Sequence, residues 1–497
     1  MSMTDQPRVL KTETLQQHFT EVIDRVQAGW RDGTAVHLIE RGLWQGLLQL
    51  GHDLLEQFFH LAGDGDLGPT ITLPKGQESQ RLPDLHPRRY VSIFGKFVLQ
   101  RVVYGSREGQ AHDFVPLDNR LQLPESDFSY VLQDWDQNLC VEQAFGPSGS
   151  VVAKILGLKQ AVDSLEHMNQ QMAQDAPTFL LNRPVPDTAG EILAMGADGK
   201  GIVMRRTDDD PAPKAHLTKG DKASQKRMAT VGTAYTVDRY VRTPEQVVAA
   251  LFRDAPEPSR DRPKPQHKHV WASLAVDEEP GSGMAQVFAW LVGEIAQRNP
   301  DLTKPMVYLS DGQESLWQAR EAYLPKHNSV DILDVLHVTP RLWQAAHVFH
   351  KEKSDAAEKM VRHQLLRVLQ GKTAGVIRRL RALGRAQDLS VAKKKTLRTV
   401  CGYLRKNRHR MRYNEYLAAG YPIASGAIEG ACRHLVKDRM ERAGMHWTVP
   451  GAQAMLNVRS VYCSDAWDEY QAYRIEREQQ DLYPYRELVA KPYSMAV

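Results

Sequence analysis

The sequence predicts an α/β fold in which a mixed sheet follows N-terminal helical, β-hairpin and helix-turn-helix segments. Three observations lead to this prediction. Apolar residues recur at three- and four-residue spacing over residues 1–70, which is typical of amphipathic helices. From about residue 72 the apolar period shortens to two, as it does in a hairpin. From residue 190 onward, successive strand-like segments precede an alternation of strands and helices, which indicates a mixed sheet.

The N-terminal part contains three predicted regions. Residues 1–70 form a helical region, and residues 71–125 form a β-hairpin region with Gly95 near the turn. Residues 126–180 contain a short helix, a turn at Gly157 and a second amphipathic helix. This pattern is typical of a helix-turn-helix that binds DNA with its second helix, although any two packed helices share it.

Residues 190–342 supply the first part of the predicted sheet. A strand in "EILAMGAD" is expected to end at Asp198, to turn at the Gly-Lys-Gly of 199–201 and to return as "IVMRR". Another strand lies in "RMATVGTAYTVDRYV", and the strands "PMVYLSD" and "SVDILDVLHV" flank the helix "ESLWQAREAYL". A long helical stretch covers 343–415, residues 416–465 complete the core, and residues 466–497 form a C-terminal tail.

Composition places the chain among soluble globular proteins. Hydrophobic residues make up 42% of the 497 residues and charged residues 25%. No apolar run approaches the roughly 20 residues needed to span a bilayer, and the N-terminus lacks the apolar centre of a secretory signal. The four cysteines, Cys140, Cys401, Cys432 and Cys463, have no metal-ligand spacing. These features predict a cytoplasmic protein that does not enter a membrane.

Charge is distributed unevenly along the chain. The net charge is only +4, but the segment from Arg341 to Trp447 holds 24 Lys and Arg against 8 Asp and Glu. That segment therefore carries +16 and the remainder −12. Such asymmetry favours a polyanionic partner for one segment, and a solvated helical face is the alternative.

Three acidic residues lie in contexts that suit metal binding. Asp198 and Asp311 are each expected to end a strand and are each followed by Gly, at the edge where α/β proteins bind ligands. Each alone is also explained as a turn residue. Glu429 lies among small residues in "ASGAIEGA". Together the three acids predict a site for two Mg²⁺ (or Mn²⁺) ions about 4 Å apart, the arrangement that promotes in-line displacement at phosphorus.

Other polar residues are candidates for the same site. Asp334 and His337 in "ILDVLHV" are possible accessory residues, or a helix-capping Asp with a partly buried His. Trp343 and Trp447 could stack on an unpaired base, although core packing is the favoured role for both. Basic residues next to the acids are expected to contact DNA phosphates: Arg433, His434, Lys437, Arg439, Arg442 and Lys200.

With these residues in order, the chain resembles DDE transposases of the RNase H-like superfamily, and within them the ISKra-type group of bacterial insertion sequences. The segments that carry the resemblance are "FVPLDNRLQLP", "ADGKG", "LSDGQESLW", "DVLHVTPRLWQAA" and "SGAIEGACRHLVKDRMERAGMHWT", the last being the most specific. The resemblance implies an RNase H-like mixed sheet in which Asp198, Asp311 and Glu429 are the catalytic, metal-binding triad. It also makes residues 343–415 an all-helical insertion between the second and third acids.

The resemblance further implies an activity and its partners. A transposase cleaves and joins phosphodiester bonds at insertion-sequence ends, so its partners are the terminal inverted repeats and the target DNA. It is expected to act on DNA as a homo-oligomer, at least a dimer. Relatives often carry paired cysteines near residues 72–115, but this chain has none there, and His86 and His112 alone cannot complete a tetrahedral site. No structural zinc is therefore predicted.

Two alternative functions stay open at this point. One is a catalytically silent, sequence-specific DNA-binding repressor derived from a transposase, which would bind repeat ends without metal-dependent nicking. The other is an RNase H-like nuclease for branched DNA, which would cleave independently of the end sequence.

Overall fold

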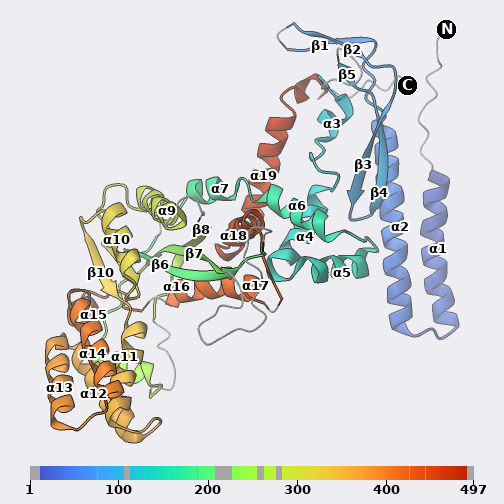
Figure 1. The fold of residues 1–497 in the computed structure, drawn as a ribbon. Coiled ribbons are helices and arrows are strands. Elements are labelled where there is room, and N and C mark those ends of the chain that lie inside the picture. The colour runs from blue at the N-terminus through green and yellow to red at the C-terminus, as the bar shows by residue number, and fades with distance from the viewer. Residues whose placement is uncertain are drawn as a thin grey trace, which may run out of the picture. The chain divides into compact units, whose positions relative to one another are not determined.

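The computed structural model describes residues 12–74, 76–105, 112–186, 189–206, 226–254, 262–275, 282–424, 426–442 and 444–489. The chain forms two compact units, of which the first contains Met1–Met168 and Asp468–Val497 and the second Asn169–Trp467 (Figure 1). Within the described ranges, every helix is too short or too polar to cross a membrane.

The first unit contains helices, a small sheet and a hairpin. Ser92 and Gly95 are paired at the end of the hairpin, so the predicted hairpin with Gly95 near its turn is confirmed. Gly157 ends the first helix of the predicted helix-turn-helix with a φ of 71°. The elements are α1 (Thr12–Arg31), α2 (Val36–Ala62), β1 (Thr70–Thr72), β2 (Glu78–Arg81), β3 (His86–Ser92), β4 (Gly95–Arg101), β5 (Tyr104–Gly105), α3 (Pro116–Leu121), α4 (Tyr130–Glu142), α5 (Phe145–Leu156), α6 (Val162–Met172), α19 (Trp467–Leu482) and η3 (Arg486–Val489).

A buried carboxylate joins the hairpin to the rest of the first unit. Arg88 of β3 and Arg101 of β4 both form ion pairs with Asp118 of α3, whose side chain is 8% exposed. The C-terminal segment packs against the same region, because Tyr483 donates to the carbonyl of Leu123 and Arg474 donates to Gln133. The segment predicted as a tail is therefore part of this unit.

The second unit is built on a five-stranded sheet. Its strand order is β10-β9-β6-β7-β8, with β6, β7 and β8 antiparallel and β6, β9 and β10 parallel, so the predicted mixed sheet is confirmed. The elements are α7 (Ala176–Asn182), β6 (Ile192–Val203), β7 (Lys226–Val237), α8 (Pro244–Leu251), β8 (Gln266–Leu274), α9 (Ser282–Arg298), β9 (Met306–Ser310), α10 (Glu314–Tyr323), β10 (Ser329–Leu333), α11 (Val335–Phe349), α12 (Asp355–Leu369), α13 (Thr373–Ala386), α14 (Val391–Lys406), η1 (Arg408–Arg410), α15 (Tyr413–Ala418), α16 (Gly426–Ala431), η2 (Cys432–Lys437), α17 (Asp438–Met440) and α18 (Val449–Cys463).

The predicted turn at residues 199–201 is wrong. Strand β6 continues through these residues and pairs with β7 over its whole length, from Ile192 with Val237 to Val203 with Lys226. The two glycines lie close to flexible side chains of the neighbouring strand β7. A Cβ atom would lie 3.1 Å from Met228 Cε at Gly199 and 3.2 Å from Lys226 Cδ at Gly201. Both glycines therefore lie inside a paired strand, where they face side chains of β7. Local turn chemistry does not reveal such a position.

Helices cover both faces of the sheet. A Cβ atom at Gly196 of β6 would lie 3.5 Å from Ile428 of α16, whereas one at Gly232 of β7 would lie 2.6 Å from Val287 of α9. Gly232 is paired with Ala197, the residue after Gly196, and successive residues of a strand point to opposite faces. Helices α16 and α9 therefore pack on opposite faces, and Gly196 and Asp198 share the α16 face.

Side chains from later in the chain donate or accept hydrogen bonds at both edges of the sheet. At β8, the amide of Val270 donates to Ser464, and the amide of Leu274 donates to Gln453 of α18. At β10, the hydroxyl of Tyr413 in α15 donates to the carbonyl of Leu333 at 2.6 Å. Covering edges in this way prevents strand pairing with another chain.

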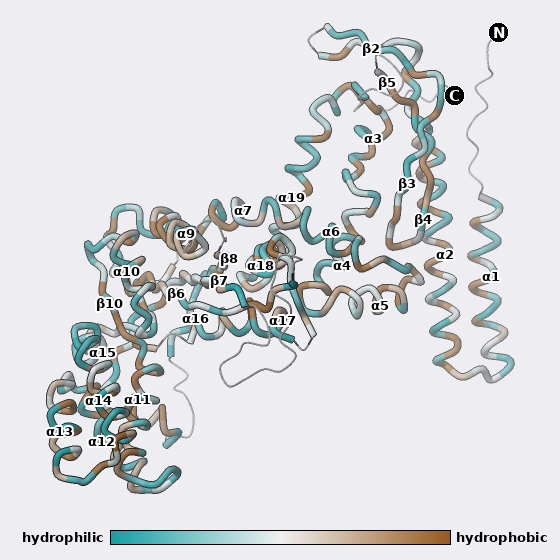
Figure 2. Tube along the Cα trace, in the orientation of Figure 1, coloured by the Kyte–Doolittle hydropathy of each residue, from teal (hydrophilic) through white to brown (hydrophobic). Residues whose placement is uncertain are grey.

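Residues 343–415, between β10 and α16 in sequence, are helical from the middle of α11 to α15 and contain no strand. Figure 2 shows hydrophobic and hydrophilic residues interleaved along α11 to α14, as expected for helices with one buried face. Buried Leu365, Val376, Leu380 and Leu404 lie on these helices. This helical segment therefore has apolar packing of its own.

Candidate metal centre

Three aspartates lie in one row across the parallel part of the sheet. Strands β6 and β9 pair from Leu193 with Met306 to Gly196 with Leu309, a constant offset of 113 residues that also separates Asp198 from Asp311. Leu333 of β10 pairs with Ser310 of β9, and the amide of the next residue, Asp334, donates to the Ser310 carbonyl at 3.0 Å. Continued past the last paired residues, this register places Asp198, Asp311 and Asp334 at equivalent positions on or directly after neighbouring strands, which are about 4.8 Å apart.

Asp198 has a different local environment from the one predicted. It lies inside β6 rather than at a strand end, but it lies beyond the last residue that pairs with β9. Its carboxylate accepts from the Gly199 amide at 2.7 Å and from the Cys432 thiol at 3.4 Å. The parallel pairing, rather than a turn, therefore places Asp198 level with the ends of β9 and β10.

Glu429 approaches this row from α16. One ligand atom from each of Asp334, His337 and Glu429 can be chosen so that all three lie within 4.8 Å of one another. The Nε2 atom of His337 lies 3.6 Å from Oε1 of Glu429. Asp334 is fully buried, accepts from the Leu336 amide at 2.7 Å and caps α11, so it combines the capping role with a place in the cluster.

Electrostatics at Glu429 are those of a crowded anionic site. Burial raises the pKa of Glu429, and the charges of Asp334 and Asp198 raise this pKa further, while His337 lowers it. Burial also raises the pKa of the Cys432 thiol, with Asp198 adding to the effect. Carboxylates held this close repel one another without a cation, and their oxygens together with the imidazole are suitable ligands for Mg²⁺ or Mn²⁺.

The metal-free Glu429→Gln variant is expected to melt at a higher temperature than the wild type near neutral pH. Because the pKa of Glu429 is raised in the native state above 4.5, the native state binds this proton more tightly than the unfolded chain does. The free energy of unfolding therefore falls as pH rises through the window between 4.5 and the raised pKa. Thermal melts in EDTA should show the gain at neutral pH and its loss below pH 4.5. An equal gain at both pH values would contradict this cause.

Asp311 is held at the end of β9 by its own turn. Its carboxylate accepts from the Gln313 amide at 2.8 Å, and its carbonyl accepts from the Trp317 indole at 2.7 Å. Tyr403 of α14 packs beside this turn; burial raises the pKa of Tyr403 to about 12, with Arg341 lowering it and Asp311 and Asp334 raising it. The helical segment thus contributes a tyrosine next to two of the aspartates.

The Gly312→Ala variant is expected to lose about 1–3 kcal/mol of stability, the usual cost of overpacking. A Cβ atom there would lie 2.4 Å from Cε2 and 3.0 Å from the hydroxyl oxygen of Tyr403. Chemical denaturation should show the loss, and adding Tyr403→Ala should reverse part of it. The control is Gly402→Ala, because the corresponding Cβ atom has no neighbour within 4 Å. If both variants lose equal stability, the contact with Tyr403 is not the cause.

The helix that carries Glu429 contains a π-helical segment. Residues Cys432–Lys437 form this segment between α16 and α17, and such segments are frequent at functional sites. Arg459 of α18, which is 2% exposed, donates from Nε to the Leu435 carbonyl at 2.9 Å and from Nη2 to the His434 carbonyl. A buried guanidinium therefore satisfies two carbonyls of the widened turn.

Four of the six predicted DNA-contacting residues lie at the surface in the segment that follows Glu429. Arg433 and His434 have side chains that are 71% and 61% exposed and lie 3.6 and 3.0 Å from Asp438. Lys437 and Arg442 are also exposed. Lys200 lies two residues after Asp198 in sequence, and its Nζ lies 3.7 Å from Glu441. The exposed side chains, which phosphates can reach, are those of Arg433, His434, Lys437 and Arg442.

Arg439 is the exception among the basic residues. It is 1% exposed, and its guanidinium lies 5.0 Å from the centre of the Trp447 ring, which is itself buried. This burial argues against the phosphate contact predicted for Arg439, because a side chain enclosed by the core cannot reach a surface ligand. Core packing, the favoured prediction for Trp447, agrees with its 7% exposure.

Sequence reasoning missed three residues around the cluster: Cys432, Tyr403 and Arg459. Cys432 donates to Asp198, Tyr403 lies beside Gly312, and Arg459 donates to carbonyls of the π-helical segment. Only Arg459 had a clue in sequence, as a lone cation in the apolar helix "VPGAQAMLNVRSVYC". A lone buried charge requires a partner, but its identity depends on the fold.

Comparison with known proteins adds little to this geometry. No protein-family model matches the chain, and no curated protein matches it. Among solved structures, the chain is similar to the Drosophila P element transposase strand transfer complex at 11% sequence identity. The similarity covers 74% of this chain and 88% of that chain, with a TM-score of 0.24. A likeness this low carries no weight for fold or function, which rest on the residues described above.

Proposed function

We propose that this protein is a DNA transposase that cleaves and joins phosphodiester bonds at insertion-sequence ends by DDE chemistry. The observation that carries the proposal is that Asp198, Asp311 and Asp334 lie on or directly after neighbouring strands, with Glu429 next to Asp334 and His337. The mixed sheet, followed by helical residues 343–415 before the Glu429 helix, supports an RNase H-like fold of the ISKra type.

Each polar residue of the cluster has a role in this proposal. Asp198, Asp311 and Glu429 are the proposed metal ligands, and Asp334 and His337 complete the set beside Glu429. Two Mg²⁺ or Mn²⁺ ions held there would activate the attacking oxygen and stabilise the leaving one. The exposed cations Arg433, Lys437 and Arg442 would hold the phosphates of the strand that is cut.

The sheet supplies the rigidity that such chemistry requires. The three aspartates lie on or directly after neighbouring strands, and Asp334 and Asp311 are both held by backbone amides. Groups fixed in this way lose little freedom when substrate binds, which lowers the barrier through orientation. At least two copies on DNA belong to the proposal, because both ends must be cut and joined together.

The proposal is tested by a nicking assay on DNA carrying the element's ends. Purified protein with Mg²⁺ or Mn²⁺ should nick at the ends, and the same reaction in EDTA should not. Binding to end DNA without any metal-dependent nicking would favour the repressor. Cleavage of branched DNA regardless of end sequence would favour the junction nuclease.

A further inference from the structure

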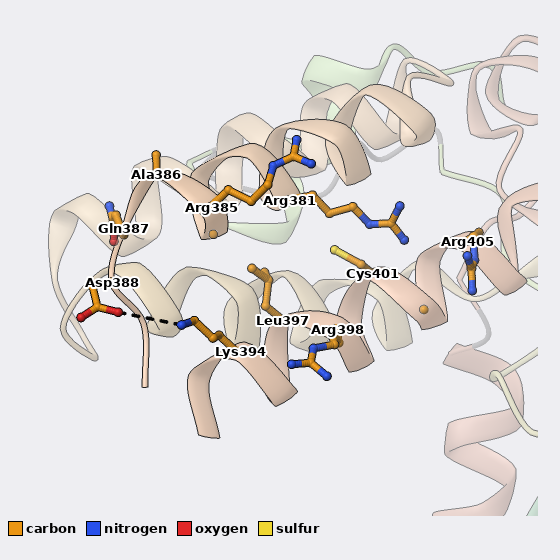
Figure 3. A pocket seen from close by; sticks show the side chains of 12 residues that line it. Arg381, Arg385, Ala386, Gln387, Asp388, Lys394, Leu397, Arg398, Cys401 and Arg405 are labelled. Atoms are coloured by element: carbon orange, nitrogen blue, oxygen red, sulfur yellow. Dashed lines mark ion pairs between the residues drawn. The ribbon is translucent and has the colours of Figure 1, made fainter. Parts of the chain in front are cut away.

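The helical segment contains a concave, strongly basic groove whose lining includes none of the carboxylates of the candidate metal centre. It is a cavity of about 870 Å³ between α13 and α14, and Figure 3 shows the side chains that line it. Leu397 and Cys401, which are 7% and 1% exposed, are the buried members of its lining. The charged residues that line it are Arg381, Arg385, Asp388, Lys394, Arg398 and Arg405.

Positive charge in this groove is largely unbalanced. The single acid, Asp388, lies 3.8 Å from Lys394. Arg385, Arg398 and Arg405 are exposed, and the described residues include no carboxylate that forms an ion pair with any of them. Like charges four residues apart, as in Arg381 with Arg385, destabilise a helix on their own. A chain that keeps them together in one hollow is suited to an anionic ligand.

The arrangement of the cations favours an extended polyanion over a single small anion. On α14 the cations Lys394, Arg398 and Arg405 follow one another at four and seven residues, so they share one helix face and span about 16 Å. One DNA strand carries a phosphate about every 3.4 Å along the helix axis, so that length faces several phosphates. The lining includes no aromatic ring to stack on a base, and arginine binds phosphate through two parallel hydrogen bonds.

We infer that the α13–α14 groove binds the sugar–phosphate backbone of DNA outside the cleavage site and independently of sequence. The choice of DNA as the partner rests on the proposed function. The groove adds affinity by displacing counterions from the duplex, and it contributes no base recognition. It thereby assigns a role to the helical segment that lies between β10 and α16.

The test compares two triple variants of the full-length protein that remove equal charge. Arg385→Gln, Arg398→Gln and Arg405→Gln remove the groove cations, whereas Arg378→Gln, Arg379→Gln and Lys395→Gln remove exposed cations of the same helices that do not line the groove. Fluorescence anisotropy with a labelled duplex of arbitrary sequence is measured over a series of KCl concentrations in EDTA. Each lost phosphate contact should make the slope of the logarithm of the binding constant against the logarithm of the KCl concentration shallower by about 0.9. The slope of the groove variant should therefore be shallower than that of the wild type by between about two and three.

Four outcomes separate the possible answers. A slope that changes in the groove variant and not in its control supports the inference. Equal slopes in all three proteins overturn it, as does an equal change in both variants. Calorimetry with tripolyphosphate gives the last outcome. If the wild type binds tripolyphosphate, the groove variant does not, and the DNA slope of the groove variant is unchanged, the inference is overturned in favour of a small phosphate ligand. Because EDTA prevents cleavage, the slope is readable even if nicking assays refute the transposase.

Discussion

Asp198→Asn, Asp311→Asn, Asp334→Asn and Glu429→Gln are each expected to lower metal-dependent DNA cleavage by about a thousandfold. A metal site stabilises the transition state by several kcal/mol, and about 4 kcal/mol corresponds to a thousandfold in rate. Asparagine and glutamine keep the size of each side chain and remove its charge. Asp334→Asn also keeps the helix cap, because asparagine accepts the Leu336 amide as well as aspartate does. Single-turnover nicking in Mn²⁺, with DNA affinity measured in parallel, checks this expectation.

The control for these variants is Glu314→Gln, three residues after Asp311. Its carboxylate is 49% exposed and pairs with Lys406 at 2.6 Å, outside the cluster. It should cleave DNA within a few-fold of the wild type. Wild-type cleavage by any one of the four site variants would remove that residue from the proposed set. Lost DNA binding together with lost cleavage would show that the substitution had damaged the fold.

Arg459→Met is expected to lower the free energy of unfolding by about 3 kcal/mol. The guanidinium donates to the carbonyls of His434 and Leu435 in the π-helical segment, and methionine fills the space without donating. A buried carbonyl left without its donor costs about 1–3 kcal/mol. The segment directly follows Ala431, the last residue of α16, so Glu429 should also be held less firmly and Mn²⁺ should bind more weakly. Urea denaturation and Mn²⁺ titration measure the two effects.

A surface arginine provides the comparison for Arg459. Arg412 is 57% exposed and pairs with Glu415 three residues later. Such pairs contribute little, so Arg412→Met should change stability by about 0.5 kcal/mol or less. If Arg459→Met unfolds at the same urea concentration as Arg412→Met, the buried guanidinium does not support the π-helical segment.

Local patterns predicted most of the secondary structure for a physical reason. A strand that is buried on one or both faces must show an apolar period of two or an apolar run, and an amphipathic helix must repeat near 3.6 residues. Strands β9 and β10, helix α10 and the hairpin of β3 and β4 all follow from such patterns. The pattern failed at Gly199 and Gly201, because a glycine inside a long paired strand looks the same in sequence as one that makes a turn.

The sequence by itself determined which chemistry is available, namely a few carboxylates at or near strand ends, a glutamate among small residues and an excess of positive charge between Arg341 and Trp447. Only the tertiary structure decided which of these groups meet. The common register of Asp198, Asp311 and Asp334 depends on hydrogen bonds between strands as far as 113 residues apart. The approach of Glu429 depends on the packing of α16 on β6, where Ile428 lies beside Gly196, and buried Arg439 lies over the Trp447 ring. Such contacts form between distant segments, so no periodicity within either segment encodes them.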